Sequence, residues 1–220
     1  MRSGTGISQL AREYRLLVLL CILVGFLIFS PIAYLAGLGR TSLTIAFLVV
    51  FVAAINAARD RLSSTVVGVA IGVPTAFLWL VRLIFNDHLI EVGADLSALC
   101  LLAFTTLVVL WRVLIAEATN FDTLCGAAAV YLLLGLFWAE SFVLIEELSP
   151  GAFDSLSKEP VERWNQVVYF SLKTLTTLGY GDLIPINPFA RLWSTLEAVT
   201  GVLFVAILVA RLVAIYSRLR

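Results

Sequence analysis

The residues with the most distinctive chemistry are those at positions 174–185, which read TLTTLGYGDLIP. Gly179 and Gly181 permit backbone conformations that residues with a Cβ avoid, and the hydroxyls of Thr176 and Thr177 precede them. Non-helical backbone at membrane depth is tolerated only where it is buried in protein or lines a water-filled path. If successive carbonyls here point the same way, they form a column of oxygens that can replace the water around a cation.

The composition indicates that this segment belongs to a membrane protein. Of the 220 residues, 61% are apolar and 14% are charged, whereas soluble domains are about half apolar and about a quarter charged. The formal net charge is zero, which predicts no nucleic-acid partner. We therefore expect membrane lipids to surround the chain.

Hydrophobic segments around the glycine-rich stretch predict an all-α transmembrane fold. About 20 apolar residues cross a bilayer as a helix, and the candidate spans are 16–38, 43–58, 65–85, 96–116, 124–148 and 189–215. The apolar piece 164–178 is too short to span, so we expect a re-entrant pore helix over 164–176, with the negative end of its dipole toward the cation path. The predicted domains are a four-helix transmembrane bundle, residues 1–118, and a pore domain, residues 119–220.

The charge distribution predicts the orientation of these spans. With a cytoplasmic N-terminus, one side receives the basic residues Arg2, Arg12, Arg15, Arg59, Arg61, Arg112, Arg218 and Arg220. The other side receives the acidic residues Asp87, Glu91, Asp95, Glu146, Glu147, Asp154, Glu159, Glu162 and Asp182. Basic loops lie in the cytoplasm. We expect a multi-pass protein of the cell membrane, plasma or bacterial inner, with both termini cytoplasmic.

The segment TTLGYGD at 176–182 resembles the potassium-channel selectivity filter, whose usual pattern is TVGYG. The order of span, pore helix, filter and span over roughly 121–216 is similar to the pore module of the tetrameric voltage-gated-like cation channel superfamily. The resemblance implies a homotetramer in which each copy contributes Thr177, Leu178, Gly179, Tyr180 and Gly181 to the filter. Potassium ions would bind at the first four of these residues, with no other cofactor.

Residues beside the filter are assigned supporting roles by the same resemblance. Thr176 and Asp182 flank the filter, and relatives use the matching acid to brace it and to attract cations. Lys173 lies close behind it, and a buried ammonium needs a partner. We expect Lys173 to pair with Asp182 or Glu197 and to tune filter stability; the alternative is a lysine that extends to the outer interface.

The aromatic residues of this region depart from the family pattern. Tyr169 and Phe170 stand where many relatives have paired tryptophans, so the surroundings of the filter must be packed differently. In relatives, the ring matching Tyr180 packs away from the ion against the pore helix.

The last span carries the candidate gate. Asn187-Pro188 is a favourable helix start, with the side chain as cap and proline at the first position. Gly201 matches the hinge glycine of relatives, although a small packing residue explains it equally well. Val205 and Val209 would line an apolar cavity that can close by dewetting, or serve ordinary helix packing.

The fourth span, 96–116, contains one arginine, Arg112. One charge crossing 100 mV is worth ~2.3 kcal/mol, against the tens supplied by several charges in each of four subunits. We therefore predict a voltage-insensitive protein in which Arg112 extends to the interface beside Trp111. Arg82 is expected to behave in the same way, paired with Asp87 or Glu91.

These features predict a potassium-selective channel that conducts K⁺ passively. The alternatives are a non-selective monovalent cation channel and a non-conducting membrane scaffold or regulatory subunit. An enzyme is not expected, because the sole histidine, His88, falls in a predicted outer loop and no nucleophile–base pattern exists.

Overall fold

A computed structural model describes residues 14–57, 62–85, 87–116 and 121–218. The helices are α2 (Arg15–Leu35), α3 (Arg40–Ala57), α4 (Leu62–Val81), α5 (His88–Ile115), α6 (Phe121–Leu148), α7 (Pro160–Leu175) and α8 (Pro188–Arg218). All except α7 are long and apolar enough to cross a membrane. The prediction of an all-α transmembrane fold with six spans is confirmed.

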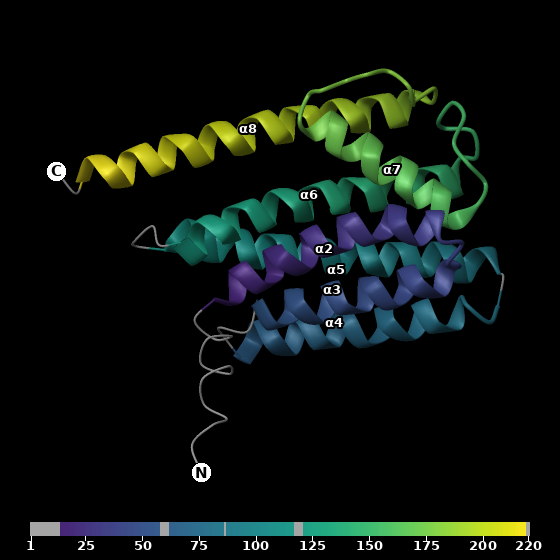
Figure 1. Cartoon of the computed structure of the whole chain (residues 1–220), viewed down its shortest axis with the longest axis horizontal. Coiled ribbons are helices and arrows are strands. Elements are labelled where there is room, and N and C mark those ends of the chain that lie inside the picture. Colours follow the sequence, from purple (N-terminus) through teal and green to yellow (C-terminus); the bar gives the residue numbers. More distant parts are fainter. Residues whose placement is uncertain (1–13, 58–61, 86, 117–120, 219–220) are drawn as a thin grey trace, which may run out of the picture.

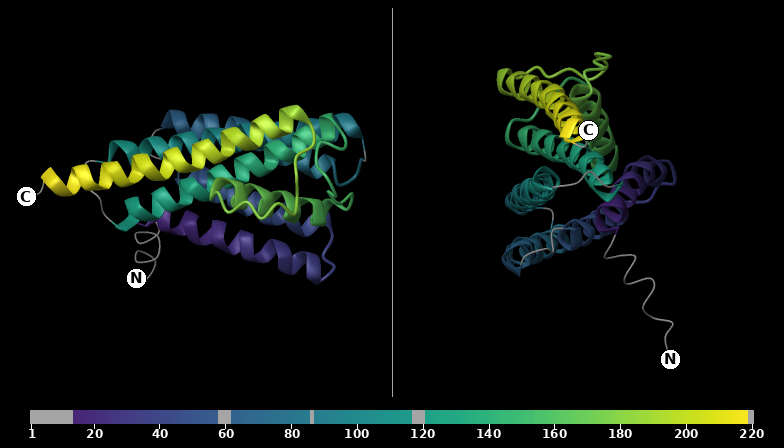
Figure 2. Two further views of the ribbon diagram at one scale, coloured as in Figure 1. Left: turned by 90° about the horizontal axis from the view of Figure 1, so that it is seen from above. Right: turned by 90° about the vertical axis from the view of Figure 1, so that its left-hand side faces the viewer.

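The six long helices run side by side, and the short α7 lies between α6 and α8 at one end of the bundle (Figure 1). We call this end the filter end, because residues 176–187 lie there. α2 begins and α8 ends at the opposite end. Seen along the bundle, α3 and α4 form one edge and α8 forms the other (Figure 2).

Helix α6 connects the two parts of the protein. It packs against α2 and α5 on one side and against α7 and α8 on the other. Its membrane span is 67% buried within the chain, whereas that of α8 is 17% buried. α8 therefore leaves most of its surface uncovered by its own chain.

Specific side chains begin the helices. Asp122 of α6 accepts hydrogen bonds from the backbone amides of Leu16 and Leu17, each at 3.1 Å, and so caps the start of α2. The Asn187 side chain accepts from the amide of Phe189 at 2.8 Å, as predicted for the start of α8. Pro31 and Pro74 lie inside α2 and α4.

An aromatic cluster joins the bundle to the re-entrant helix. Trp164 of α7 packs edge-on against Phe47 of α3, with ring centroids 4.6 Å apart, and Phe47 contacts Trp79 of α4 at the same separation. Asn165 of α7 accepts a hydrogen bond from the Ser30 hydroxyl of α2 at 2.7 Å. The helix that precedes the filter thus rests on the first helices of its own chain.

The fourth span begins eight residues earlier than predicted, at His88 instead of residue 96. The added turns carry Glu91 and Asp95, which pair with Arg40 and Arg82 respectively. Because ion pairs neutralise these charges, the transmembrane helix can include them. Hydropathy along the sequence cannot reveal such pairs. The expected pairing of Arg82 with Asp87 or Glu91 is therefore wrong.

Arg112, expected to extend to the interface beside Trp111, forms a hydrogen bond at the end of α3. Its Nη1 donates to the carbonyl oxygen of Ala57 at 2.9 Å and so ties α5 to the end of α3. Five of the basic residues that predicted the orientation lie outside the described residues: Arg2, Arg12, Arg59, Arg61 and Arg220. The predicted domain boundary at 118/119 also lies outside them.

Candidate selectivity filter and its supports

The backbone after α7 alternates in handedness. Thr177, Gly179 and Gly181 have φ values of 60°, 59° and 75°, whereas Leu178 and Tyr180 have negative φ. Glycine adopts positive φ without strain, but for a β-branched residue such as Thr177 it is a genuine outlier. Strained backbone of this kind clusters at functional sites.

The chain leaves α7 through a tight set of backbone hydrogen bonds. α7 ends at Leu175, one residue short of the predicted end. The amide of Leu178 donates to the carbonyl of Lys173 at 2.8 Å, and the Thr176 hydroxyl donates to the carbonyl of Leu172 at 2.7 Å. The last turn of α7 thereby determines where the glycine-rich strand begins.

Lys173 pairs with Asp182, one of the two partners that the sequence left open. The Lys173 side chain is 3% exposed, and its ammonium donates to Oδ1 of Asp182. The rings of Tyr169 and Phe170 lie 4.9 and 5.4 Å from the ammonium. The hydrogen bond from Lys173 lowers the pKa of the Asp182 carboxyl, and a second one from Tyr169 acts in the same direction. The segment between α7 and Asp182 is thus attached to α7 at both ends, by the chain itself at its start and by the Lys173–Asp182 pair at its end.

Glu197 makes a different connection behind the same helix. Its carboxyl is fully buried, and its Oε1 lies 2.5 Å from the Ser171 hydroxyl, which lies 2.7 Å from the carbonyl oxygen of Gly135. The second oxygen of Glu197 has no hydrogen-bond partner among the described residues. These contacts connect α8 to α7 and α7 to α6. The sequence reading missed Ser171, because a single serine on an apolar helix face carries no recognisable pattern.

Gly201 marks the closest approach of α8 to α7. A Cβ at this position would lie 2.0 Å from the carbonyl oxygen of Leu175, the last residue of α7. The same carbonyl accepts a hydrogen bond from the Tyr131 hydroxyl at 3.1 Å. Of the two explanations for Gly201, the structure gives a direct reason for the packing role, whereas its role as a hinge stays a prediction.

The segment after the filter is anchored to the α6–α7 connection. The amide of Ile186 donates to Ala152 at 2.8 Å, and that of Asp154 donates to Ile184 at 2.9 Å. Phe153 then packs edge-on against Phe170 of α7, with centroids 5.4 Å apart. Residues on both sides of the filter are therefore held against α7.

Several predicted site residues remain uncovered in the single chain. Leu178 and Tyr180 are 55% and 69% exposed, and Val205 and Val209 of α8 are 48% and 53% exposed. Packing of the Tyr180 ring against a pore helix, as the resemblance implies, therefore requires a surface beyond that of its own chain.

These observations define a class of protein: a six-span helical membrane protein with a re-entrant helix and a glycine-rich loop of alternating handedness. The sequence of residues 123–218 matches the model of the ion channel family. The relatives described next are potassium channels, so the similarity of this part of the chain is to channels and not to enzymes.

Three relatives illustrate the similarity. The inward rectifier potassium channel Kirbac3.1 of Paramagnetospirillum magnetotacticum is 33% identical over 114 residues, which cover 51% of this chain and 32% of that protein. The potassium voltage-gated channel protein shk-1 of Caenorhabditis elegans is 34% identical over 87 residues, 38% of this chain and 16% of that protein. The potassium channel protein kcv of Paramecium bursaria Chlorella virus 1 is 29% identical over 72 residues, 31% of this chain and 77% of that protein.

The chain spans a third or less of the length of the first two relatives. A comparison with the solved structures found no significant match.

Proposed function

We propose that four copies of this chain form a potassium-selective channel that conducts K⁺ passively across the cell membrane. The observation that carries the proposal is the alternating sign of φ from Thr177 to Gly181. In a β-strand consecutive peptide planes flip, so the carbonyls point to opposite sides. Alternating handedness removes this flip and lets the carbonyls face one side, as a potassium filter requires.

The uncovered surfaces support assembly around the filter. One column of oxygens cannot enclose an ion, and within one chain the filter residues Leu178 and Tyr180 stay exposed. α8 offers a long uncovered apolar face at the same edge of the molecule (Figure 2). Four copies with this edge inward would surround a common axis with four filter strands and cover these side chains. The filter end would face the outside, with both termini in the cytoplasm.

The bundle supports conduction without an arginine-rich voltage sensor. α5 carries Arg112 as its basic residue in the last turn, and its guanidinium is bonded to the carbonyl of Ala57. Moving one such charge through 100 mV is worth only ~2.3 kcal/mol. Voltage steps should therefore change the current through the electrical driving force on K⁺ and not through a sensor.

The test is a bilayer recording of the purified protein with potassium on one side and sodium on the other. The wild-type reversal potential should lie far from zero, in the direction that opposes potassium flow, and the current should show no voltage-dependent activation. A reversal potential near zero would indicate a non-selective cation channel, and absence of current in a folded tetramer would indicate a scaffold. Either result contradicts the proposal.

A matched pair of glycine variants separates filter effects from general backbone strain. Gly179 and Gly151 both have positive φ, and a Cβ on either would meet no atom within 4 Å. Gly179→Ala should abolish selective current, because the alanine disfavours the filter conformation. Gly151→Ala, in the α6–α7 connection, should retain it. Equal currents from the two variants would contradict the assignment of the filter.

A further inference from the structure

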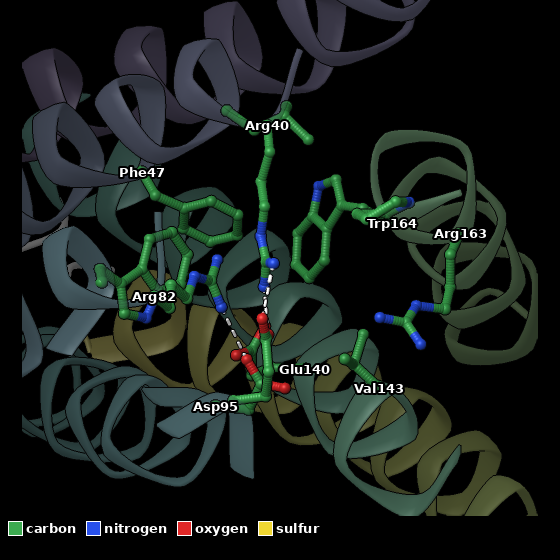
Figure 3. A pocket seen from close by; sticks show the side chains of 12 residues that line it. Arg40, Phe47, Arg82, Asp95, Glu140, Val143, Arg163 and Trp164 are labelled. Atoms are coloured by element: carbon green, nitrogen blue, oxygen red, sulfur yellow. Dashed lines mark hydrogen bonds and ion pairs between the residues drawn. The ribbon is translucent and has the colours of Figure 1, made fainter. Parts of the chain in front are cut away.

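A small charged cavity lies at the filter end, where the four-helix bundle meets α6 and α7. Its volume is about 50 Å³, and it is lined by side chains from five helices and by Arg82, which follows α4. Figure 3 shows Arg82 reaching toward Asp95, with Glu140 close beside this pair. The aromatic rings of Phe47 and Trp164 form part of its wall.

Three arginines at this cavity each have an acidic partner. Arg40 forms two hydrogen bonds with Glu91. Arg82 pairs with Asp95 at 2.9 Å, and Arg163 pairs with Glu147 at 2.8 Å. The positive charges of these three side chains are therefore balanced by three carboxylates.

Glu140 of α6 is a fourth carboxyl group with no such partner. It is 2% exposed, and its Oε1 is buried without a hydrogen bond among the described residues. It lies close enough to interact electrostatically with both Asp95 and Arg82. An isolated buried carboxylate is strongly unfavourable, and a second negative charge beside Asp95 makes it more so.

The cavity suits a proton better than a larger ligand. Three guanidinium groups disfavour a bound metal cation, and the described residues contain no group of three or more side chains suited to hold one. Within the described part of the chain, the buried Nε of Arg82 and Nε1 of Trp164 also lack hydrogen-bond partners. A polar cavity of this size admits water, which can carry a proton to and from Glu140.

We propose that Glu140 is a proton-binding site reached from the filter end, and that its occupancy alters the contact between the bundle and the pore region. With the proton bound, the charges of the cavity balance. Without it, the Glu140 carboxylate repels Asp95 and competes for Arg82, whose Nε–H can donate a hydrogen bond to it. Because Asp95 and Arg82 belong to the bundle and Glu140 to α6, the proton changes the attraction between the two parts.

The other charged groups near the pore region lie outside this cavity. Lys173 and Asp182 form their own pair at the filter, and Glu197 is buried behind α7 next to Ser171. Neither pair lines the cavity. A response to pH that arises at Asp182 or Glu197 would therefore survive replacement of Glu140.

The first test does not depend on conduction. Infrared difference spectra of the purified protein between acidic and alkaline buffer should contain a carboxylic C=O band that Glu140→Gln removes and Glu197→Gln retains. A wild-type spectrum without such a band, or a band unchanged in Glu140→Gln, would overturn the proposal. This result can be obtained even if the protein carries no potassium current.

The second test uses the current. A pH step on the filter side should change the wild-type current, and Glu140→Gln, a neutral variant of nearly the same shape, should lose that component. Asp154→Asn, which neutralises an exposed acid at the same end, should keep the full response. Equal responses in wild type and Glu140→Gln would refute the coupling to the pore region.

Discussion

The Lys173 ammonium, buried on α7, forms an ion pair with Asp182, whose side chain is 52% exposed at the far end of the filter segment. Six residues, Thr176–Gly181, lie between the end of α7 and Asp182, and the sign of φ alternates over the last five of them. The pair therefore closes a loop around the proposed filter, so its strength should affect how well the filter keeps its conformation.

Replacing Lys173 with methionine should destabilise the conducting state. Asp182 has a lowered pKa, so its stabilising effect is present above the ordinary aspartate pKa and is lost as the pH falls through the lowered value. Without Lys173 that pKa rises, and the loss should begin at a higher pH. Currents recorded over a series of acidic pH values on the filter side will measure the shift.

Lys158→Met provides the control, because Lys158 is the other lysine of the chain and is exposed in the α6–α7 connection. Its acid response should match that of wild type. If Lys173→Met left conduction, inactivation and acid response unchanged, the tuning role of Lys173 would be wrong.

Gly201→Ala should separate α8 from the end of α7. The added methyl group would lie 2.0 Å from the Leu175 carbonyl oxygen, a backbone atom that cannot rotate away. Overpacking of this kind costs typically ~1–3 kcal/mol and occasionally more. Thermal unfolding of the purified protein should show a lower midpoint, and the selective current should fall.

Gly25→Ala in α2 is the matched control, because a Cβ at that helical position would meet no atom within 4 Å. Its unfolding midpoint should equal that of wild type or exceed it slightly. A Gly201→Ala protein as stable and as selective as Gly25→Ala would contradict the close packing of α8 on α7.

Glu197→Gln should preserve the connection between α8 and α6, whereas Glu197→Ala should lose it. One serine hydroxyl carries a single hydrogen and cannot donate to both Gly135 and Glu197. A glutamine amide can donate to Ser171 while Ser171 donates to Gly135. Alanine leaves the buried hydroxyl with one partner fewer, at a cost of ~1–3 kcal/mol.

Unfolding midpoints and potassium currents of the two variants will distinguish them. Ser171→Ala should resemble Glu197→Ala, since both remove the same contact. Equal losses in Glu197→Gln and Glu197→Ala would show that an ionised carboxylate, not a hydrogen-bonding side chain, is needed.

Arg82→Met should destabilise the bundle strongly. Arg82 and Asp95 are both buried, and removal of one partner leaves an uncompensated buried charge at a cost of ~3–5 kcal/mol. The double variant Arg82→Met/Asp95→Leu should recover much of this loss, because apolar side chains replace the whole pair. Thermal unfolding of single and double variants measures the coupling. A double variant less stable than Arg82→Met would argue against the pair.

The six spans could be predicted from the sequence, and the glycine-rich segment recognised as a candidate filter, because their signals are local. Apolar runs identify helices that a bilayer must accept, and the GYG triplet with its flanking residues is distinctive wherever it occurs. The short helix before Thr176 was found in the same way. Its start at Pro160 was missed, because the first turn is polar and shows no apolar pattern. The Glu159 side chain caps this turn.

The partners of the charged and small residues were decided only by the tertiary structure. From the sequence, Lys173 had two candidate partners and Arg82 was given the wrong ones, because pairing depends on the rotation and depth of neighbouring helices. The cavity at Glu140 brings together residues up to 124 positions apart, from Arg40 to Trp164. The spacing of residues along one helix indicates which side chains share a face. Which side chains meet between helices depends on how all the helices pack together.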